Sequence, residues 1–194
     1  MSTQTNSKPS GNLLRFEDPP VTKLLFADVR LSWLWLIVRL YVGYEWFTAG
    51  WAKAQNPAWF GGSAGSALTG FVKGALTKST GAHADVQGWY AAFLQNMVLP
   101  NVGLWSNFVV VGELLVGIAL ILGIFTGVAA FFGSFMNFNY LLAGTVSTNP
   151  ILFLLAMLVI MAWKTAGWLG LDRWILPLLG TPWTPGKVFK NADK

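Results

Sequence analysis

The chain has 194 residues, a length typical of one domain, of which 54% are hydrophobic and only 11% are charged. Soluble domains usually carry about 25% charged residues, so this composition indicates a membrane protein. Cysteine is absent and His83 is the only histidine, which excludes disulfides, iron–sulfur clusters, thiolate metal sites and a haem held by two histidines of one chain. The net charge of +5 is modest and not gathered on one face, so we expect no nucleic acid partner.

Residues 1–30 form a polar N-terminal tail that does not have the pattern of a cleavable signal peptide. We therefore expect the apolar run that follows to be a retained membrane helix. Runs of about 20 apolar residues, the length that crosses a bilayer, predict four transmembrane helices. These spans lie at about residues 31–52, 103–124, 126–146 and 149–169.

The predicted fold class is an all-α membrane protein, a four-transmembrane-helix bundle over residues 31–180 with a basic C-terminal tail over 181–194. The joints at 123–127 and 147–150 are short, so the helices on either side of each joint should be antiparallel neighbours.

The distribution of lysine and arginine predicts the orientation of these helices. Lys and Arg are frequent in the N-terminal tail and near the C-terminus, whereas the long loop 53–102 holds only Lys53, Lys73 and Lys78. An even number of spans puts both termini on one side, and the positive-inside rule assigns that side to the cytoplasm. We therefore expect a multi-pass protein of a bacterial or archaeal cell (inner) membrane, with both termini cytoplasmic.

The loop 53–102 also contains a helical pattern. Apolar residues recur at helical spacing over 68–76 and again over 86–98, where Pro100 closes the run. We predict two short amphipathic helices that lie on the outer face and cap the bundle. Capping alone explains this pattern as well as a ligand site does.

Three ionisable residues lie inside the predicted spans: Arg39, Glu45 and Glu113. A charge at this depth costs several kcal/mol unless it is paired or hydrated. The helical rise of about 1.5 Å per residue places Arg39, Glu113 and Asn137 near one level at the midplane, with Glu45 further out. Glycines on the first two spans would let the helices approach closely, so we predict a pair between Arg39 and Glu113.

Such a pair has two explanations. It fixes the register of two helices and neutralises itself, or it belongs to a polar pocket for a lipid-soluble head group with two carbonyls, such as a quinone. In the second case Arg39, Asn139 or Tyr140 would donate to a carbonyl, and Glu45 or Glu113 would relay protons. The candidate catalytic residues are Glu113, Arg39 and Glu45, and the candidate quinone-binding residues are Arg39, Asn137, Asn139 and Tyr140.

Several motifs in these spans resemble the DoxX/DoxD family. They are RLYVG (39–43) followed by GWAK (50–53), GELLVG (112–117) followed by LGIFTGVAA (122–130), and two runs similar to the DoxD-like branch, NFNYLLAGTVSTNP (137–150) and AGWLGLDRWILPLLG (166–180). The resemblance covers most of residues 31–180. One position departs from it, because Gly127 stands where relatives often carry a basic residue.

The resemblance implies a four-helix membrane fold and a link to respiratory redox chemistry, since DoxD is the membrane subunit type of thiosulfate:quinone oxidoreductase. Arg39, Glu113 and Asn139 match polar positions of the family pattern. The implied function is a quinone-linked membrane subunit, and whether the chain is itself an enzyme stays open.

A partner subunit is expected if the chain acts in redox chemistry. Thiosulfate is a dianion that must be oxidised outside the hydrocarbon, and this sequence has no cysteine and no metal site that would store electrons. Two other functions remain. One is a non-catalytic accessory or scaffold subunit of a larger membrane complex. The other is a small-solute or ion transporter, although the repeated broken helices of transporters are missing.

Overall fold

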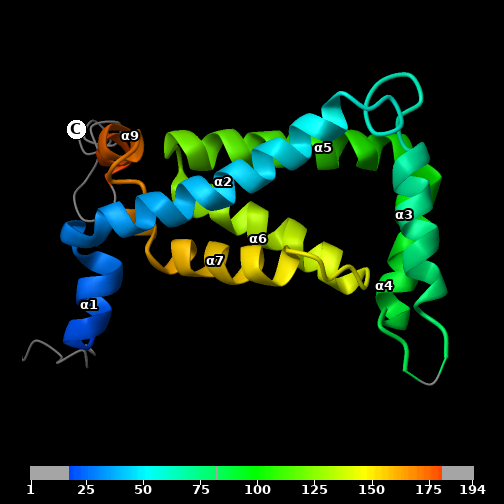
Figure 1. Cartoon of the computed structure of the whole chain (residues 1–194), viewed down its shortest axis with the longest axis horizontal. Helices are drawn as coiled ribbons and strands as arrows, with labels where there is room; N and C mark the ends of the chain where they lie inside the picture. The colour runs from blue at the N-terminus through cyan, green and yellow to red at the C-terminus, as the bar shows by residue number, and fades with distance from the viewer. Residues whose placement is uncertain (1–17, 82, 181–194) are drawn as a thin grey trace, which may run out of the picture.

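The computed structural model describes residues 18–81 and 83–180, and these residues form helices and connecting turns without a β-strand. This confirms the all-α class. Four helices run beside one another along the long axis of the molecule (Figure 1). They pack in a closed order, each on two neighbours, and comprise α2 (Ser32–Ala54), α5 (Val102–Leu122), α6 (Thr126–Leu142) and α7 (Asn149–Met161).

The closest packing in the molecule joins α2 to α5 in an antiparallel register. A Cβ placed on Gly117 would lie 2.5 Å from the backbone nitrogen of Phe47, and one placed on Gly50 would lie 2.9 Å from the Cβ of Glu113. Gly43 lies against Ile121 in the same way. Glycine is required at these contacts because any side chain would push the two backbones apart.

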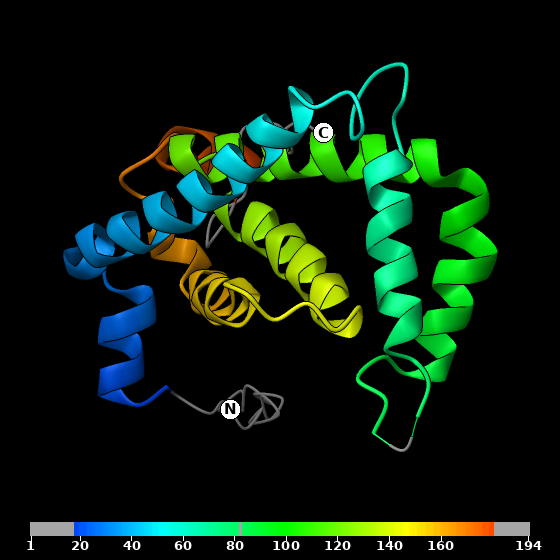
Figure 2. The same cartoon turned by 45° about the vertical axis from the view of Figure 1, so that its right-hand side comes forward.

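Two shorter helical elements stand across one end of the long helices, as Figure 2 shows: α3 (Ser66–Thr77) and α4 (Gly88–Phe93). They share an apolar core that includes Val72, Tyr90 and Leu94. The sequence suggested that the helical run ends at Pro100. In the structure it continues from α4 through a π-helical turn and a 3-10 turn into α5. Because proline lacks the N–H that a regular helix needs, the helix bends there instead of running straight.

The opposite end carries α1 (Pro20–Ala27), α8 (Trp163–Ala166) and α9 (Asp172–Leu179). Between α1 and α2, Arg30 hydrogen-bonds the carboxylate of Asp28 at 2.6 and 2.9 Å, which lowers the pKa of that carboxyl group. The last predicted span is wrong in length, because α7 ends at Met161. The chain then turns back so that Gly170 packs on Gly123, where a Cβ would lie 2.8 Å from the facing Cα atom.

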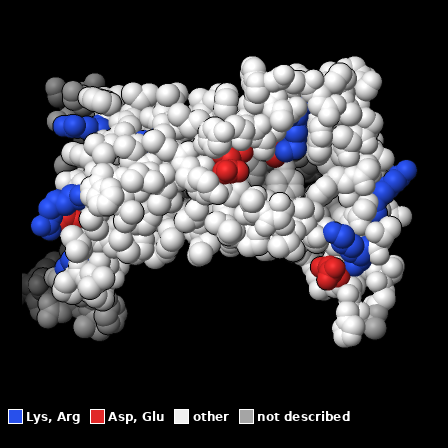
Figure 3. All heavy atoms as spheres, in the orientation of Figure 1, with Lys and Arg blue, Asp and Glu red and all other residues white. Residues whose placement is uncertain are grey.

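Among the described residues, one continuous helix, Gly88–Leu122, is long and apolar enough to cross a membrane. The apolar helix α7 has only 13 residues, and α2 is long enough but carries Arg39, Glu45 and Lys53. On the face shown in Figure 3, most of the surface is uncharged, and the basic side chains gather mainly toward the two ends of the long axis.

Candidate functional site: a buried carboxylate beside a lateral cavity

The pair predicted between Arg39 and Glu113 is not formed. Arg39, only 1% exposed, donates through Nη1 to the carbonyl oxygens of Leu120 and Ile121, the latter at 2.9 Å, and through Nη2 to Leu169 at 3.3 Å. Two of these acceptors lie in the last turn of α5, where carbonyl groups have no partner within the helix. Arg39 therefore caps α5 and ties it to the segment before α9.

The helix register explains why the predicted pair fails. Glu113 lies level with Gly50 of α2, and Arg39 lies beside Gly123. Because Arg39 and Gly50 are eleven positions apart on one helix, the two charged groups are separated by about 16 Å along the axis. The predicted levels depend on both spans beginning at matching depths, and they do not include the distance that a long side chain reaches along a helix.

Glu113 pairs instead with Lys53, a residue that the sequence indicated as a charge of the loop and as the end of the GWAK motif, but not as a site residue. The Lys53 ammonium lies 2.8 and 2.7 Å from the two carboxylate oxygens of Glu113. The hydroxyl of Tyr140 donates to the same carboxylate at 2.7 Å. The Glu113 carboxylate is almost fully buried, whereas the Lys53 side chain is 22% exposed. The three groups form one connected polar cluster, Lys53–Glu113–Tyr140, drawn from α2, α5 and α6.

A second polar contact lies next to this cluster. The hydroxyl of Tyr90 donates to the backbone and side-chain oxygens of Asn139 at 3.0 and 3.1 Å, and the Asn139 amide donates to Phe135 at 2.8 Å. The ring of Phe71 meets the edge of the Tyr140 ring. The cap formed by α3 and α4 thus reaches the end of α6. Tyr90 was expected only as part of an apolar stripe, and its hydroxyl was the one signal of this contact.

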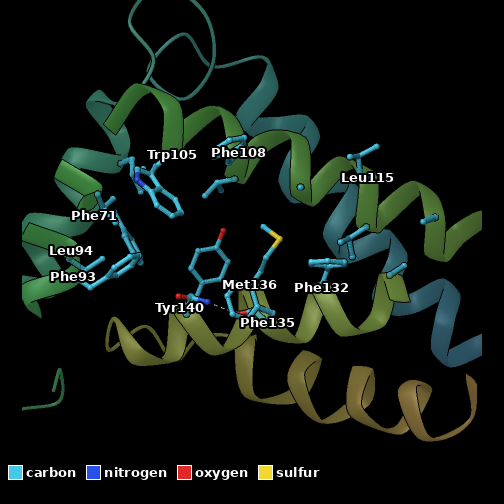
Figure 4. Close-up of a pocket in the computed structure, with 18 of the residues that line it drawn as sticks. Phe71, Phe93, Leu94, Trp105, Phe108, Leu115, Phe132, Phe135, Met136 and Tyr140 are labelled. Carbon is cyan, nitrogen blue, oxygen red and sulfur yellow. Dashed lines mark hydrogen bonds between the residues drawn. The ribbon is translucent and has the colours of Figure 1, made fainter. Parts of the chain in front are cut away.

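Phe71, Tyr90, Asn139 and Tyr140 line a cavity of about 610 Å³ between α5 and α6, which α3 and α4 close at one end. Its walls are mainly apolar and aromatic, and Figure 4 shows Phe108, Phe132 and Met136 projecting into it. Tyr140 stands in the same space with its hydroxyl directed toward α5. The rings of Phe108 and Phe132 are half exposed, so the cavity opens sideways between the two helices.

A comparison with family models identifies the family of the chain. The model described as DoxX matches residues 34–145, more than half of the sequence. The chain belongs to the DoxX family. No curated protein and no solved structure matches it in the corresponding comparisons. The DoxX family is membrane-associated, and the matched region includes Arg39, Lys53, Glu113 and Tyr140.

Two other predicted site residues of this DoxX-family protein lie apart from the cavity. Glu45 is half-buried, and no described side chain hydrogen-bonds its carboxylate. Asn137 is fully buried, and neither atom of its amide has a hydrogen-bond partner among the described residues. Neither residue lines the cavity. The structure therefore places Asn139 and Tyr140 in the cavity wall and joins Glu113 to Tyr140 by a hydrogen bond, whereas Arg39, Glu45 and Asn137 lie elsewhere.

Asp172, which the sequence analysis did not single out, is buried at the end of the molecule opposite α3 and α4 (Figure 1). Its carboxylate accepts hydrogen bonds from the backbone amides of Phe125 and Thr126 at 2.6 and 2.8 Å. Those amides open α6, where the first N–H groups of a helix lack partners. Asp172 therefore caps α6 from α9 and has a structural role.

Proposed function

We propose that this DoxX-family protein crosses the membrane with α2, α5, α6 and α7. Large apolar side chains cover the outward side of each helix, including Ile37, Leu104, Phe131 and Leu154, each more than half exposed. Soluble proteins rarely expose apolar patches of more than a few hundred Å². Helices α6 and α7 are shorter than the about 20 residues of an average span, a mismatch that bilayers accommodate by thinning.

In this proposal the end that carries α1 and α9 faces the cytoplasm, and α3 and α4 lie on the outer side of a bacterial or archaeal cell membrane. The lysine and arginine bias of the two tails supports this orientation.

The lateral cavity is the observation that carries the functional proposal: it receives a lipid-soluble ring molecule of the quinone class from the bilayer. Its volume of about 610 Å³ lies within the roughly 300–1,000 Å³ of small-molecule pockets. Aromatic side chains such as Phe108 and Phe132 suit a flat ring. Tyr140 and Asn139 supply polar groups at the closed end, where they would hold a carbonyl oxygen.

A bound quinone supplies two-electron, two-proton redox chemistry. This chain contributes the binding site, the orientation of the ring and the exclusion of water by its apolar walls. The sequence contains no cysteine that would hold an iron–sulfur cluster and so store electrons. The electrons therefore come from a partner subunit. The finer proposal, a DoxD-like membrane subunit of a thiosulfate:quinone oxidoreductase, rests on the resemblance of residues 137–150 and 166–180 to the DoxD-like branch.

Quinone binding by the full chain in lipid nanodiscs tests the cavity. Titration with decylubiquinone, followed by tryptophan fluorescence, should show saturable quenching because Trp105 lines the cavity. Phe135→Trp narrows the cavity and should weaken binding at least about tenfold, as expected when a larger side chain overfills a pocket. Phe131→Trp is the matched control, because Phe131 lies on the same helix, is exposed and does not line the cavity. Equal binding by both variants would contradict the proposal.

A second candidate function is a non-catalytic accessory subunit. It is favoured by the observation that Arg39 bonds carbonyl groups of its own chain and that Lys53, Glu113 and Tyr140 bond one another. Purification in mild detergent distinguishes the two. A stable complex that contains no quinone, and whose assembly tolerates Phe135→Trp, supports the accessory function.

A further inference from the structure

The Lys53–Glu113–Tyr140 cluster connects the cavity with the aqueous surface of the protein. Tyr140 lines the cavity. Lys53 lies near the end of α2, where Gln55 and Asn56 follow as exposed residues. Between them, the carboxylate of Glu113 has almost no exposed surface, so any proton that reaches it must pass through one of its two partners.

The geometry of the cluster suits proton transfer. Its heavy-atom contacts are 2.7 to 2.8 Å long, within the range of about 2.6–3.2 Å for direct transfer. Other ionisable groups do not interrupt it. Among the described residues, only Lys53 from α2 and Tyr140 from α6 donate hydrogen bonds to Glu113, and Tyr90 of α4 bonds Asn139 instead.

We propose that Tyr140, Glu113 and Lys53 form a proton pathway between the cavity and the aqueous surface on the side of α3 and α4. This inference rests on the proposed function, in that a quinone bound in the cavity is the group that exchanges the protons. Tyr140 is the residue that touches the ligand, and Glu113 and Lys53 act through it.

Reduction of a quinone takes up two electrons and two protons. The ring gains two electrons from the partner subunit, whose donor is a reduced sulfur compound, and each carbonyl oxygen gains one proton. Tyr140 breaks its O–H bond to give a proton to the ligand, after its hydroxyl rotates away from Glu113. The Lys53 ammonium gives a proton to the Glu113 carboxylate, Glu113 passes this proton to the Tyr140 phenolate, and Lys53 then takes a proton from water. The second proton follows by another passage.

A purely structural ion pair makes a different prediction for Lys53→Arg. Arginine keeps the positive charge and the contact with the carboxylate, but it does not deprotonate in proteins and so cannot pass a proton on. If the cluster only fixes the helices, Lys53→Arg should behave like the wild type. If it conducts protons, Lys53→Arg should block the pathway in a folded protein.

The first experiment needs no ligand. The full chain is placed in vesicles in one orientation, and infrared difference spectra follow the Glu113 carboxyl band, assigned with Glu113→Gln, after a pH jump on one side. The band should respond to the side of α3 and α4, and Lys53→Arg should slow this response at least about tenfold. Lys73→Arg, an exposed lysine of α3, is the matched control. A band that responds from the opposite side or from neither side, or that is unchanged in Lys53→Arg, overturns the pathway.

The second experiment tests delivery to the cavity. Decylubiquinone bound to the protein is reduced at an electrode, and proton uptake is followed with a membrane-impermeant pH dye, while bound quinone is measured separately by extraction. Tyr140→Phe should retain the quinone but slow proton uptake at least about tenfold. Unchanged uptake overturns the role of Tyr140. If the wild type retains no quinone, the proposed function fails, whereas the ligand-free experiment still decides whether Glu113 exchanges protons through Lys53.

Discussion

At the scale of single residues, the buried charges of this protein separate into two groups with different roles. Arg39 satisfies the carbonyl groups of Leu120 and Ile121 at the end of α5, about 11 Å along that helix from Glu113. Glu113, in contrast, joins a side chain in the cavity wall to a lysine at the surface. The first arrangement stabilises the fold, and the second lies where chemistry is proposed.

Arg39→Met should therefore lower stability without affecting quinone binding. The substitution leaves the carbonyl groups that Arg39 satisfies buried without their donor, which costs about 1–3 kcal/mol for each unsatisfied group. The midpoint of thermal unfolding in detergent measures this loss, and decylubiquinone titration measures binding. A variant that keeps its stability but loses the quinone would restore Arg39 as a binding residue, as the sequence first suggested.

The sequence indicated candidate polar residues but not which of them meet. Glu113, Asn139 and Tyr140 were expected at a polar pocket; Tyr140 hydrogen-bonds Glu113, and Asn139 lines the same cavity as Tyr140. Lys53 was not expected there, because its contact depends on the register of α2 against α5 and on the reach of a long side chain. Such long-range pairing leaves no mark in residue spacing.

At the scale of helices, glycine contacts determine how α2 and α5 pack. We expect Gly117→Ala to destabilise the protein by about 1–3 kcal/mol, because the new Cβ would lie 2.5 Å from the Phe47 backbone. Without the steric contact, replacing glycine by alanine inside a helix would stabilise the protein by about 1 kcal/mol. A measured loss of stability therefore shows that the steric contact outweighs the gain in helix propensity.

Gly112→Ala on the same helix is the matched control. Its Cβ would face the sulfur of Met136 at 3.3 Å, and a flexible methionine side chain moves easily. Gly112→Ala should therefore be close to neutral in the same unfolding measurement. Equal effects at the two positions would show that helix propensity, and not the approach of α2 and α5, decides the outcome.

The helices themselves follow from local sequence more fully than their ends do. Helices occupy all four apolar segments, and α3 and α4 form where the amphipathic pattern predicted them. The end of α7 and the bend at Pro100 were not predicted. Both depend on packing, since the chain after Met161 turns back toward Gly123 and α4 must pack on α3 while it continues into α5.

At the scale of the whole molecule, the two sets of short helices lie at opposite ends of the long axis, with α1 and α9 at one end and α3 and α4 at the other (Figure 1). If the four long helices cross the membrane, these ends lie on opposite sides of it. The absence of cysteine from the chain makes this arrangement directly measurable, since a single introduced thiol reports only its own position. Val21 of α1 and Thr80 after α3 are both exposed.

Val21→Cys and Thr80→Cys should therefore respond differently to a membrane-impermeant maleimide applied to intact cells. We expect labelling of Thr80→Cys in intact cells and of Val21→Cys only after lysis, because the positive-inside rule assigns the end with α1 to the cytoplasm. The unsubstituted chain is the control for background labelling. If both variants are labelled from the same side, the four helices do not all cross the bilayer. Lys53 would then open toward the side that also carries α1, so the same result would reassign the side from which protons enter the cavity.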